Sequence, residues 1–282
     1  MIRLVTDSTC DLPAGELARL NVAVVPINII FDTEEYQEGE TLTYDEFFAR
    51  VDATGMVPRT SQPSPGRFVQ EYRRLADEGA TTILSLHVTS KLSGTFNSAQ
   101  LAADTVKDEV DVRVFDSLAG SAGTGFMLRE ADVLLRQGAG ADEVLARWHE
   151  IRDHLRIYFY LDTLKYARMS GRVGALQHSL ASVLSIKPLV KLDAGMLDVA
   201  ERVRSRRAAL DRLLVLAREH ADGRPVNVAV VHALDGPGGD ALLARAQEAL
   251  DCRQTFVARL ASSLVTHLGV GTLGIVLYPV EP

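Results

Sequence analysis

The first half of this 282-residue chain alternates short β-rich runs with stretches that have a helical pattern. The β-rich runs are Ile2 to Thr6, Asn21 to Ile30, Thr81 to Val88 and Asp111 to Phe115. Such alternation is typical of stacked β-α-β units, in which parallel strands form one sheet and helices cover its faces. We therefore expect an amino-terminal α/β domain with a parallel sheet over residues 1–154.

The pattern changes in the second half. Ile157 to Leu161 is β-rich, and two further runs, Ile186 to Leu192 and Met196 to Val203, flank an Asp-Ala-Gly turn that predicts a hairpin. The remaining predicted elements are strands at Val226 to His232, Gln254 to Leu260 and Thr272 to Tyr278, and helices at Ser205 to Ala221 and Pro237 to Ala249. This order predicts a second, α+β domain over residues 155–282 with a mixed or antiparallel sheet.

Charge and hydropathy exclude several classes of protein. A formal net charge of -7 opposes sequence-independent binding to nucleic acid, which requires a basic surface. The apolar stretch from Val22 to Phe31 contains Pro26 and is shorter than the roughly 20 residues that span a bilayer. The first residues lack the apolar core of a secretory signal, and Cys10 and Cys252 are too few for a disulfide framework. We expect a cytoplasmic protein without stable membrane insertion.

The chain also lacks the common cofactor motifs. It contains no Walker loop, no Rossmann glycine pattern after the first predicted strand, and no paired metal-ligand histidines. We therefore expect no cofactor and no metal.

Two polar stretches, Thr60 to Gly66 and Ser90 to Thr95, are rich in hydroxyl side chains, and both are predicted to open helices. The first amides of a helix have no partner within the helix, and the helix dipole favours an anion there. A carboxylate or a phosphate would suit such a pair of loops. The alternative for the second stretch is that Ser93 is an ordinary N-cap.

The segment Asp7 to Pro13 follows the first predicted strand, at the sheet edge where α/β proteins bind ligands. Its carboxylates and hydroxyls suit a binding site. Thr9 or Asp11 could equally serve as a cap for the next helix. The sequence leaves both interpretations open.

Ser93 is also a candidate nucleophile, a role that would require a histidine base. His87, His232 and His267 are the candidate bases, and their spacing does not select one. The flanks of Ser93 lack the Gly-x-Ser-x-Gly turn of α/β-hydrolases. A serine hydrolase of thioesterase type, using Ser93 and His267, is the alternative function from a different class.

Two further features have both a structural and a functional interpretation. Arg202 to Arg207 contains four arginines in an otherwise acidic chain, which is either a solvated face or a docking patch for an acidic partner. His267 precedes Gly269 and Gly271 just before the last predicted strand. These glycines would let the imidazole approach a ligand closely, although a lone histidine is often structural.

Together these motifs resemble the DegV family of bacterial fatty-acid-binding proteins over essentially the whole chain. Several motifs in the same order make the resemblance specific, whereas each alone is weak. The matching stretches are Thr6 to Thr9 with Asp11 to Pro13, Thr60 to Ser64, Leu92 to Thr95 with Ser98 and Ala99, Asp116 and Ser117 with Ser121 and Gly123, Lys187 to Leu189, Gly195, and Arg202 to Arg207.

The resemblance implies a two-domain protein with one long-chain fatty acid, such as palmitate, stearate or oleate, in a tunnel between the domains. By position, the family's carboxylate contacts fall on Thr60 or Ser61, on Ser93 with the amide of Gly94, and on His267. A regulator that binds another amphiphilic acid is a third possibility, and a cavity too short for a long acyl chain would favour it.

The resemblance also implies a partner. The protein is similar to the acyl-carrying subunit of a bacterial fatty acid kinase system, which presents the bound carboxylate to a separate kinase for acyl-phosphate formation. It would not itself be an enzyme. Kinase docking would then fall on Arg202, Arg204 and Arg206.

The chain departs from the family pattern at two places. Val270 occupies the proline position of the family's His-x-Gly-Pro-Gly motif, so the rigidity of that turn is in question. Ser170-Gly171-Arg172 stands where the family often has Gly-Gly-Arg. Neither change removes a ligand group.

Overall fold

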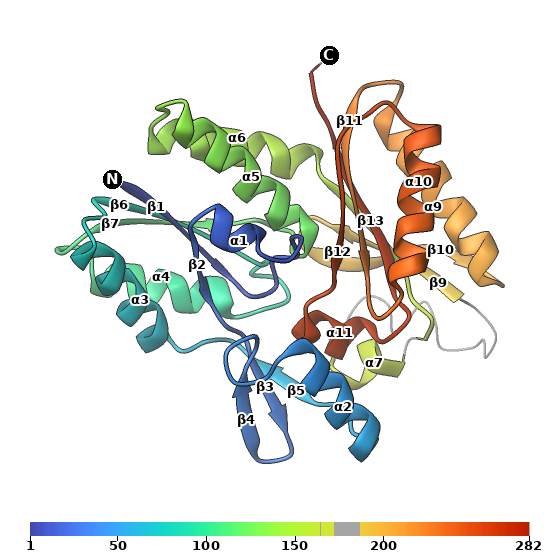
Figure 1. Cartoon of the computed structure of the whole chain (residues 1–282), viewed down its shortest axis with the longest axis horizontal. Coiled ribbons are helices and arrows are strands. Elements are labelled where there is room, and N and C mark those ends of the chain that lie inside the picture. The colour runs from blue at the N-terminus through green and yellow to red at the C-terminus, as the bar shows by residue number, and fades with distance from the viewer. Residues whose placement is uncertain (164, 172–186, 282) are drawn as a thin grey trace.

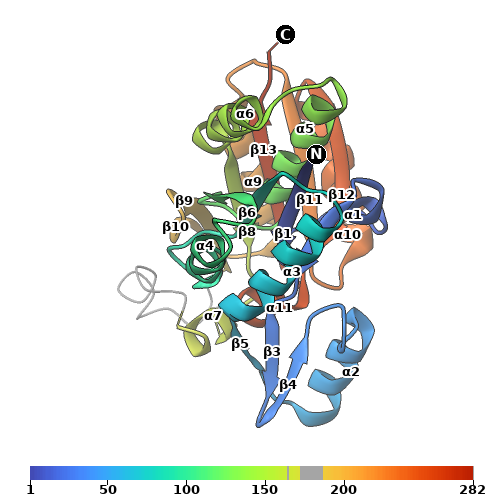
Figure 2. The same ribbon diagram turned by 90° about the vertical axis from the view of Figure 1, so that its left-hand side faces the viewer.

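The computed structural model describes residues 1–163, 165–171 and 187–281, and its strands form three sheets within these residues. The two larger sheets lie next to each other, and a small third sheet projects from the molecule together with helix α2 (Figures 1 and 2). Two residues of the sequence prediction, Arg172 and Ile186, lie outside the described residues.

The N-terminal sheet has four parallel strands in the order β2-β1-β6-β7. This confirms the predicted parallel α/β architecture. Because the strands are parallel, their carboxyl ends meet at one edge, and the loops that follow β1, β6 and β7 lie together there. The elements are β1 (Ile2–Asp7), α1 (Glu16–Arg19), β2 (Val22–Val25), α3 (Pro65–Asp77), β6 (Thr82–His87), α4 (Thr95–Thr105), β7 (Asp111–Asp116), α5 (Ala122–Arg136) and α6 (Ala141–His154).

Helices cover both faces of this sheet, which explains why its two central strands, β1 and β6, are largely buried and rich in apolar residues. Val5 and Ile83 belong to a core cluster that includes residues of α3 and α4. Their strand neighbours Leu4 and Leu84 belong to a cluster that includes residues of α5 and α6. Successive side chains of a strand point to opposite faces, so each helix pair covers one face.

The small antiparallel sheet has the strand order β4-β3-β5 and was not predicted from the sequence. The expected single strand from Asn21 to Ile30 is wrong, because the chain leaves the parallel sheet after Val25 and enters the small sheet at Asn28. Pro26 lies at this break, where a residue without an N–H cannot continue a sheet ladder. The elements are β3 (Asn28–Phe31), β4 (Glu34–Gln37), α2 (Tyr44–Thr54) and β5 (Arg59–Ser61).

The C-terminal sheet has six strands in the order β10-β9-β8-β13-β11-β12. Only the β11–β12 pair is parallel among its described pairs, so the predicted mixed sheet is confirmed. The β9–β10 hairpin turns at Ala194 and Gly195, which have positive φ angles of 46° and 84°. The elements are β8 (Arg156–Tyr160), α7 (Lys165–Met169), β9 (Lys187–Asp193), β10 (Met196–Val203), α9 (Arg206–Ala221), β11 (Val226–His232), α10 (Gly236–Ala249), β12 (Cys252–Arg259), α11 (Ser262–Leu268) and β13 (Leu273–Pro279).

Helix α5 joins the two halves through aromatic contacts. The ring of Phe126 lies 5.1 Å from the ring of Phe256 on β12 and 5.2 Å from that of Tyr278 on β13, in edge-on geometry. Such pairs contribute beyond the area that they bury. The last strand before residue 155, β7, belongs to the parallel sheet, and the first strand after it, β8, belongs to the six-stranded sheet. A division into domains 1–154 and 155–282 remains a prediction.

Candidate functional site

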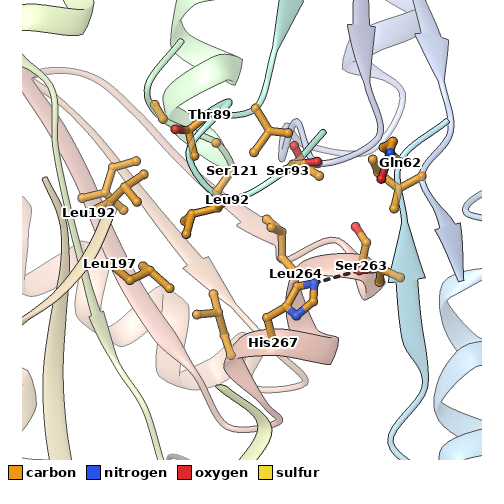
Figure 3. A pocket seen from close by; sticks show the side chains of 18 of the residues that line it. Gln62, Thr89, Leu92, Ser93, Ser121, Leu192, Leu197, Ser263, Leu264 and His267 are labelled. Atoms are coloured by element: carbon orange, nitrogen blue, oxygen red, sulfur yellow. Dashed lines mark hydrogen bonds between the residues drawn. The ribbon is translucent and has the colours of Figure 1, made fainter. Parts of the chain in front are cut away.

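A cavity lies among the loops at the carboxyl edge of the parallel sheet, strand β5, helix α11 and the β8–β10 region (Figure 3). In Figure 3, Gln62 and Ser263 lie at one side of the cavity and Leu192 and Leu197 at the opposite side. The polar lining residues are Thr9, Thr60, Ser61, Gln62, Thr89, Ser93, Ser121, Ser263 and His267. The others are Ile27, Val88, Leu92, Gly94, Ala119, Gly120, Ile157, Phe159, Leu192, Leu197, Leu264 and Leu268.

The structure brings together the five residues that the sequence nominated for binding. Thr60, Ser61, Ser93, Gly94 and His267 all line this cavity. All five are partly buried, so the polar end of the cavity remains in contact with solvent. Their proposed role as contacts to a carboxylate is a separate question, addressed below.

Thr60 and His267 form a hydrogen bond across the polar end. The hydroxyl oxygen of Thr60 lies 2.9 Å from Nε2 of His267, although the two residues are 207 positions apart in the chain. Thr60 comes from β5 and His267 from the last turn of α11. This contact fixes where the imidazole sits relative to the strand hydroxyls.

The loop that contains Ser93 and Gly94 packs directly against Gln62. A Cβ atom added to Gly94 would lie 2.9 Å from Cδ of Gln62, so a larger residue would displace the Gln62 side chain. The hydroxyl of Ser93 contacts the Thr95 hydroxyl at 2.8 Å and accepts a hydrogen bond from its N–H at 3.3 Å. The N-cap of α4 is nevertheless Gly94, with no side-chain cap hydrogen bond, so the interpretation of Ser93 as an ordinary N-cap is wrong. Ser93 precedes the N-cap and lines the cavity.

A buried network supports the loops that follow β1 and β6. Oδ2 of Asp7 accepts the N–H of Val88 at 2.9 Å and lies 3.1 Å from Nδ1 of His87. Oδ1 accepts the N–H and the hydroxyl of Thr9, at 3.0 and 2.5 Å. Burial acts to raise the pKa of Asp7, but the His87 contact and these hydrogen bonds outweigh it, and the pKa is lowered. The ionised carboxylate thus holds Thr9 and Val88, two cavity residues, in place.

Asp11 does not cap a helix. The N-cap of α1 is Gly15, with no side-chain hydrogen bond. Instead, the carboxylate of Asp11 accepts hydrogen bonds from the hydroxyl of Ser121 at 2.5 Å and from the N–H of Ala261 at 2.8 Å. The cap interpretation of Asp11 is therefore wrong, because this side chain reaches across to the C-terminal half.

Two expectations about local structure need correction. Thr60 and Ser61 lie on β5 instead of opening a helix, and Ser64 is the residue that caps α3. His267 lies in helix α11 and not in the glycine-rich turn, which begins at Gly269. A Cβ at Gly269 would lie 2.4 Å from the ring of Tyr166, so this glycine permits packing against Tyr166 instead of bringing the imidazole to a ligand.

The geometry does not assemble a serine nucleophile with a histidine base. Among the described residues, the hydroxyl of Ser93 forms hydrogen bonds with Thr95 and with no histidine. His87 is fully buried between Ser85 and Asp7, and His232 accepts the N–H of Asp235. No contact that Ser93 makes supports the hydrolase alternative.

The arginine cluster lies at the junction of β10 and α9. Arg202, Arg204, Arg206 and Arg207 are all exposed. Arg206 forms an ion pair with Asp235, which reduces its availability to a partner. The cluster is separate from the cavity lining, so its function is not ligand contact.

Sequence reasoning missed most of the apolar wall. Leu192 and Leu197 come from the β9–β10 hairpin, Ile157 and Phe159 from β8, and Leu264 from α11. These residues carry ordinary strand and helix patterns, and only the pairing of distant elements places them around one cavity. The sequence showed only that Ser263 is a serine close to His267, and its burial is evident only in the structure.

The described residues contain neither a metal-ligand cluster nor a membrane-spanning helix. Within residues 1–163, 165–171 and 187–281, no cluster of histidine, cysteine, aspartate or glutamate residues has the arrangement of a metal site. In the same ranges, no helix is both long and apolar enough to cross a membrane.

The protein is of the α/β class and contains a cavity that has polar residues at one end and an apolar wall over most of its remainder. The family model described as an uncharacterised protein of the DegV family matches residues 1–280. The chain belongs to the DegV family.

Individual relatives agree with this assignment. A DegV domain-containing protein of Streptomyces coelicolor is 33% identical over 98% of each chain. A DegV family protein from Thermus thermophilus, whose structure is described as showing fatty acid binding, has a TM-score of 0.91 and 35% identity over 99% of each chain. DegV of Bacillus subtilis, described as a fatty acid binding protein, has a TM-score of 0.90 and 29% identity over 99% of each chain.

Proposed function

We propose that the cavity holds one long-chain fatty acid, such as palmitate, stearate or oleate, in a tunnel between the two halves of the chain. The supporting observation is that Thr60, Ser61, Ser93, Gly94 and His267, which come from three separate segments, all line one cavity whose remaining wall is largely apolar. The carboxylate lies among these five residues. The fatty acid binding described for the Thermus and Bacillus relatives supports the same ligand class.

The acyl chain supplies most of the affinity. Burial of each CH₂ group contributes about 0.8 kcal/mol, so a chain of about sixteen carbons contributes more than about ten kcal/mol before the entropic losses of binding. The wall residues from β8, α11 and the β9–β10 hairpin come from distant parts of the chain and meet around the acyl group.

The carboxylate needs several donors, because a charge taken out of water without partners is strongly unfavourable. Thr60, Ser61, Ser93 and His267 provide hydroxyl and imidazole donors, and Gly94 provides a backbone N–H. Gly94 precedes the first residue of α4, so the positive end of the helix dipole also favours an anion at this position.

The same proposal includes presentation of the carboxylate to a separate fatty acid kinase in the cytoplasm. The partly buried polar end leaves the head group within reach of a second protein, while the acyl chain stays covered. The exposed residues Arg202 and Arg204 provide the docking surface, and Arg206 contributes less because it pairs with Asp235. The protein itself carries the substrate and does not catalyse the transfer.

Native mass spectrometry of the purified protein, followed by organic extraction, tests the ligand. One long-chain fatty acid per chain is expected, and Ser93→Ala combined with His267→Ala should reduce its retention. A protein that is empty and also fails to take up added palmitate contradicts the proposal. Full occupancy in the double variant would leave the ligand class intact but show that the site residues are wrong.

A further inference from the structure

Helix α11 carries His267 but is too short to be stable without contacts to the rest of the protein. It has seven residues, from Ser262 to Leu268, and isolated helices of this length are unstable in water. Its N-cap residue, Ala261, makes no side-chain cap hydrogen bond. Contacts from outside the helix must therefore fix its first turn.

Two carboxylates from the N-terminal half make these contacts. Asp11 accepts the N–H of Ala261 at 2.8 Å. Glu38, which follows β4, accepts both the N–H and the hydroxyl of Ser263, at 2.8 and 2.7 Å. A residue held through its backbone and its side chain at once has a fixed orientation.

The same two carboxylates also hold cavity residues of the N-terminal half. The second oxygen of Asp11 accepts the hydroxyl of Ser121 at 2.5 Å. Glu38 accepts the hydroxyl of Ser8 at 2.5 Å, and Ser8 in turn accepts the N–H of Ile27 at 2.9 Å. Ser121 and Ile27 line the cavity, as does Ser263. Glu38 thus links two lining residues, Ser263 directly and Ile27 through Ser8, and Asp11 links the lining residue Ser121 to Ala261, the residue before α11.

General stability is a poor explanation for these groups. Among the described residues, neither Asp11 nor Glu38 forms an ion pair with a cationic side chain. Burial raises the pKa of both carboxyl groups, against the effect of their hydrogen-bond donors. A buried carboxylate that has hydrogen-bond donors but no cationic partner is still costly, so a placement that serves a binding site is the better account.

We propose that Asp11 and Glu38 are positioning residues that fix the first turn of α11 and thereby hold His267 against Thr60 at the carboxylate-binding end of the cavity. The effect on ligand rests on the proposed function, whereas the effect on His267 does not. Ser263 and His267 are four residues apart and lie on one face of the helix, so a rotation that releases Ser263 displaces the imidazole. An error of about 1 Å in such a group is enough to weaken its action strongly.

The test compares Glu38→Ala, Glu38→Gln and a control, Glu130→Ala. Glu130 accepts hydrogen bonds from Tyr278 and Arg147 and lies outside the cavity, so its removal disturbs a comparable carboxylate elsewhere. The first readout is the imidazole NMR signal of His267 in ligand-free protein, assigned with His267→Ala. The second is the affinity for palmitate.

Glu38→Ala should shift the His267 signal and weaken palmitate binding about tenfold. Glu38→Gln, which keeps acceptors and donors for the serine hydroxyls, should recover most of both effects, and Glu130→Ala should alter neither. Unchanged His267 signals in Glu38→Ala overturn the proposal even if affinity falls. If Glu38→Ala does not fold, Ser263→Ala removes one of the same hydrogen bonds and is judged by the same two readouts. A His267 shift in a protein that never binds palmitate would refute the proposed function alone.

Discussion

The carbonyl oxygen of Gly195, at the tip of the β9–β10 hairpin, accepts a hydrogen bond of 3.1 Å from the hydroxyl of Thr89, which follows β6. A Cβ at Gly195 would lie 2.4 Å from that hydroxyl oxygen. Thr89, and Leu192 and Leu197 on the hairpin, line the cavity. The contact therefore joins the β9–β10 hairpin of the C-terminal sheet to the loop after β6 at the edge of the parallel sheet.

Gly195→Ala should lower the free energy of unfolding by about 2–4 kcal/mol, because a positive φ strains alanine and the added methyl group meets Thr89. The control is Gly223→Ala, where φ is also positive, at 73°, but a Cβ meets nothing within 4 Å. This control should lose about 1–2 kcal/mol. Urea unfolding of both variants measures the difference, and equal losses would show that the hairpin contact is unimportant.

Removal of the imidazole should weaken fatty acid binding. A hydrogen bond to a charged group contributes about 1.5–3 kcal/mol, so we expect His267→Ala to bind palmitate about tenfold to a hundredfold less tightly. Thr60→Val, which loses only the hydroxyl that contacts His267, should have a smaller effect in the same direction. His154→Ala, at the exposed end of α6, is the control. Equal affinities for all three variants would remove His267 from the site.

A charge in the apolar wall should exclude the acyl chain. Leu197 is 7% exposed and lines the cavity, whereas its neighbour Met196 on the same strand is 40% exposed. Leu197→Glu should therefore abolish measurable palmitate binding, because a buried carboxylate has no partner there. Met196→Glu should bind as the wild type does. Retained binding in Leu197→Glu would place the acyl chain elsewhere.

The stability of the protein should depend on the ionisation of Asp11. Burial raises the pKa of Asp11 well above 3.8, so the folded state favours the protonated carboxyl. The stabilisation from Asp11 is then complete below pH 3.8 and is lost as the pH rises through the folded-state pKa. The free energy of unfolding of the wild type, relative to Asp11→Asn, should decrease as the pH rises above 3.8 and through the folded-state pKa. A difference that is constant with pH would contradict this prediction.

Charge reversal in the arginine cluster should affect the kinase step alone. Arg202→Glu with Arg204→Glu should abolish phosphorylation of bound fatty acid by the cognate kinase and leave palmitate affinity unchanged, since the cavity lining does not include these residues. Lys107→Glu with Arg136→Glu makes the same change in net charge on the N-terminal half. Identical turnover in both double variants would identify the cluster as an ordinary solvated surface.

The sequence predicted the parallel sheet, the hairpin and the mixed sheet because each has a local pattern of strands and turns. It did not predict the small sheet, because β4 and β5 are only four and three residues long. The break at Pro26 has a local signal, yet apolar residues continue on both sides and mask the change of sheet. Short edge elements of this kind are defined by their partners more than by their own residues.

The polar end of the cavity was partly accessible to sequence analysis, since Ser93 and Gly94 follow the parallel strand β6. Thr60 and Ser61 were recognised as hydroxyl residues, but their place on the antiparallel strand β5 was not predicted. The residues that support the cavity were not predicted either. Nothing in the sequence near Glu38 indicates that it accepts hydrogen bonds from Ser263, which is 225 positions away. The role of Asp11 could not be predicted either, because an aspartate that caps a nearby helix and one that accepts a hydrogen bond from a distant segment look the same in a sequence.

The hydrogen bond between Asp11 and the N–H of Ala261 spans 250 positions of the chain. During synthesis on the ribosome, the parallel sheet can fold long before the segment around Ala261 emerges, because domains fold as units from the amino terminus. The cavity, in contrast, is incomplete until α11, which supplies part of its lining, has packed against Asp11 and Glu38. Under the proposed function, a fatty acid can therefore bind only to a nearly complete chain, and we expect a truncated product that lacks α11 to expose apolar surface that chaperones and proteases recognise.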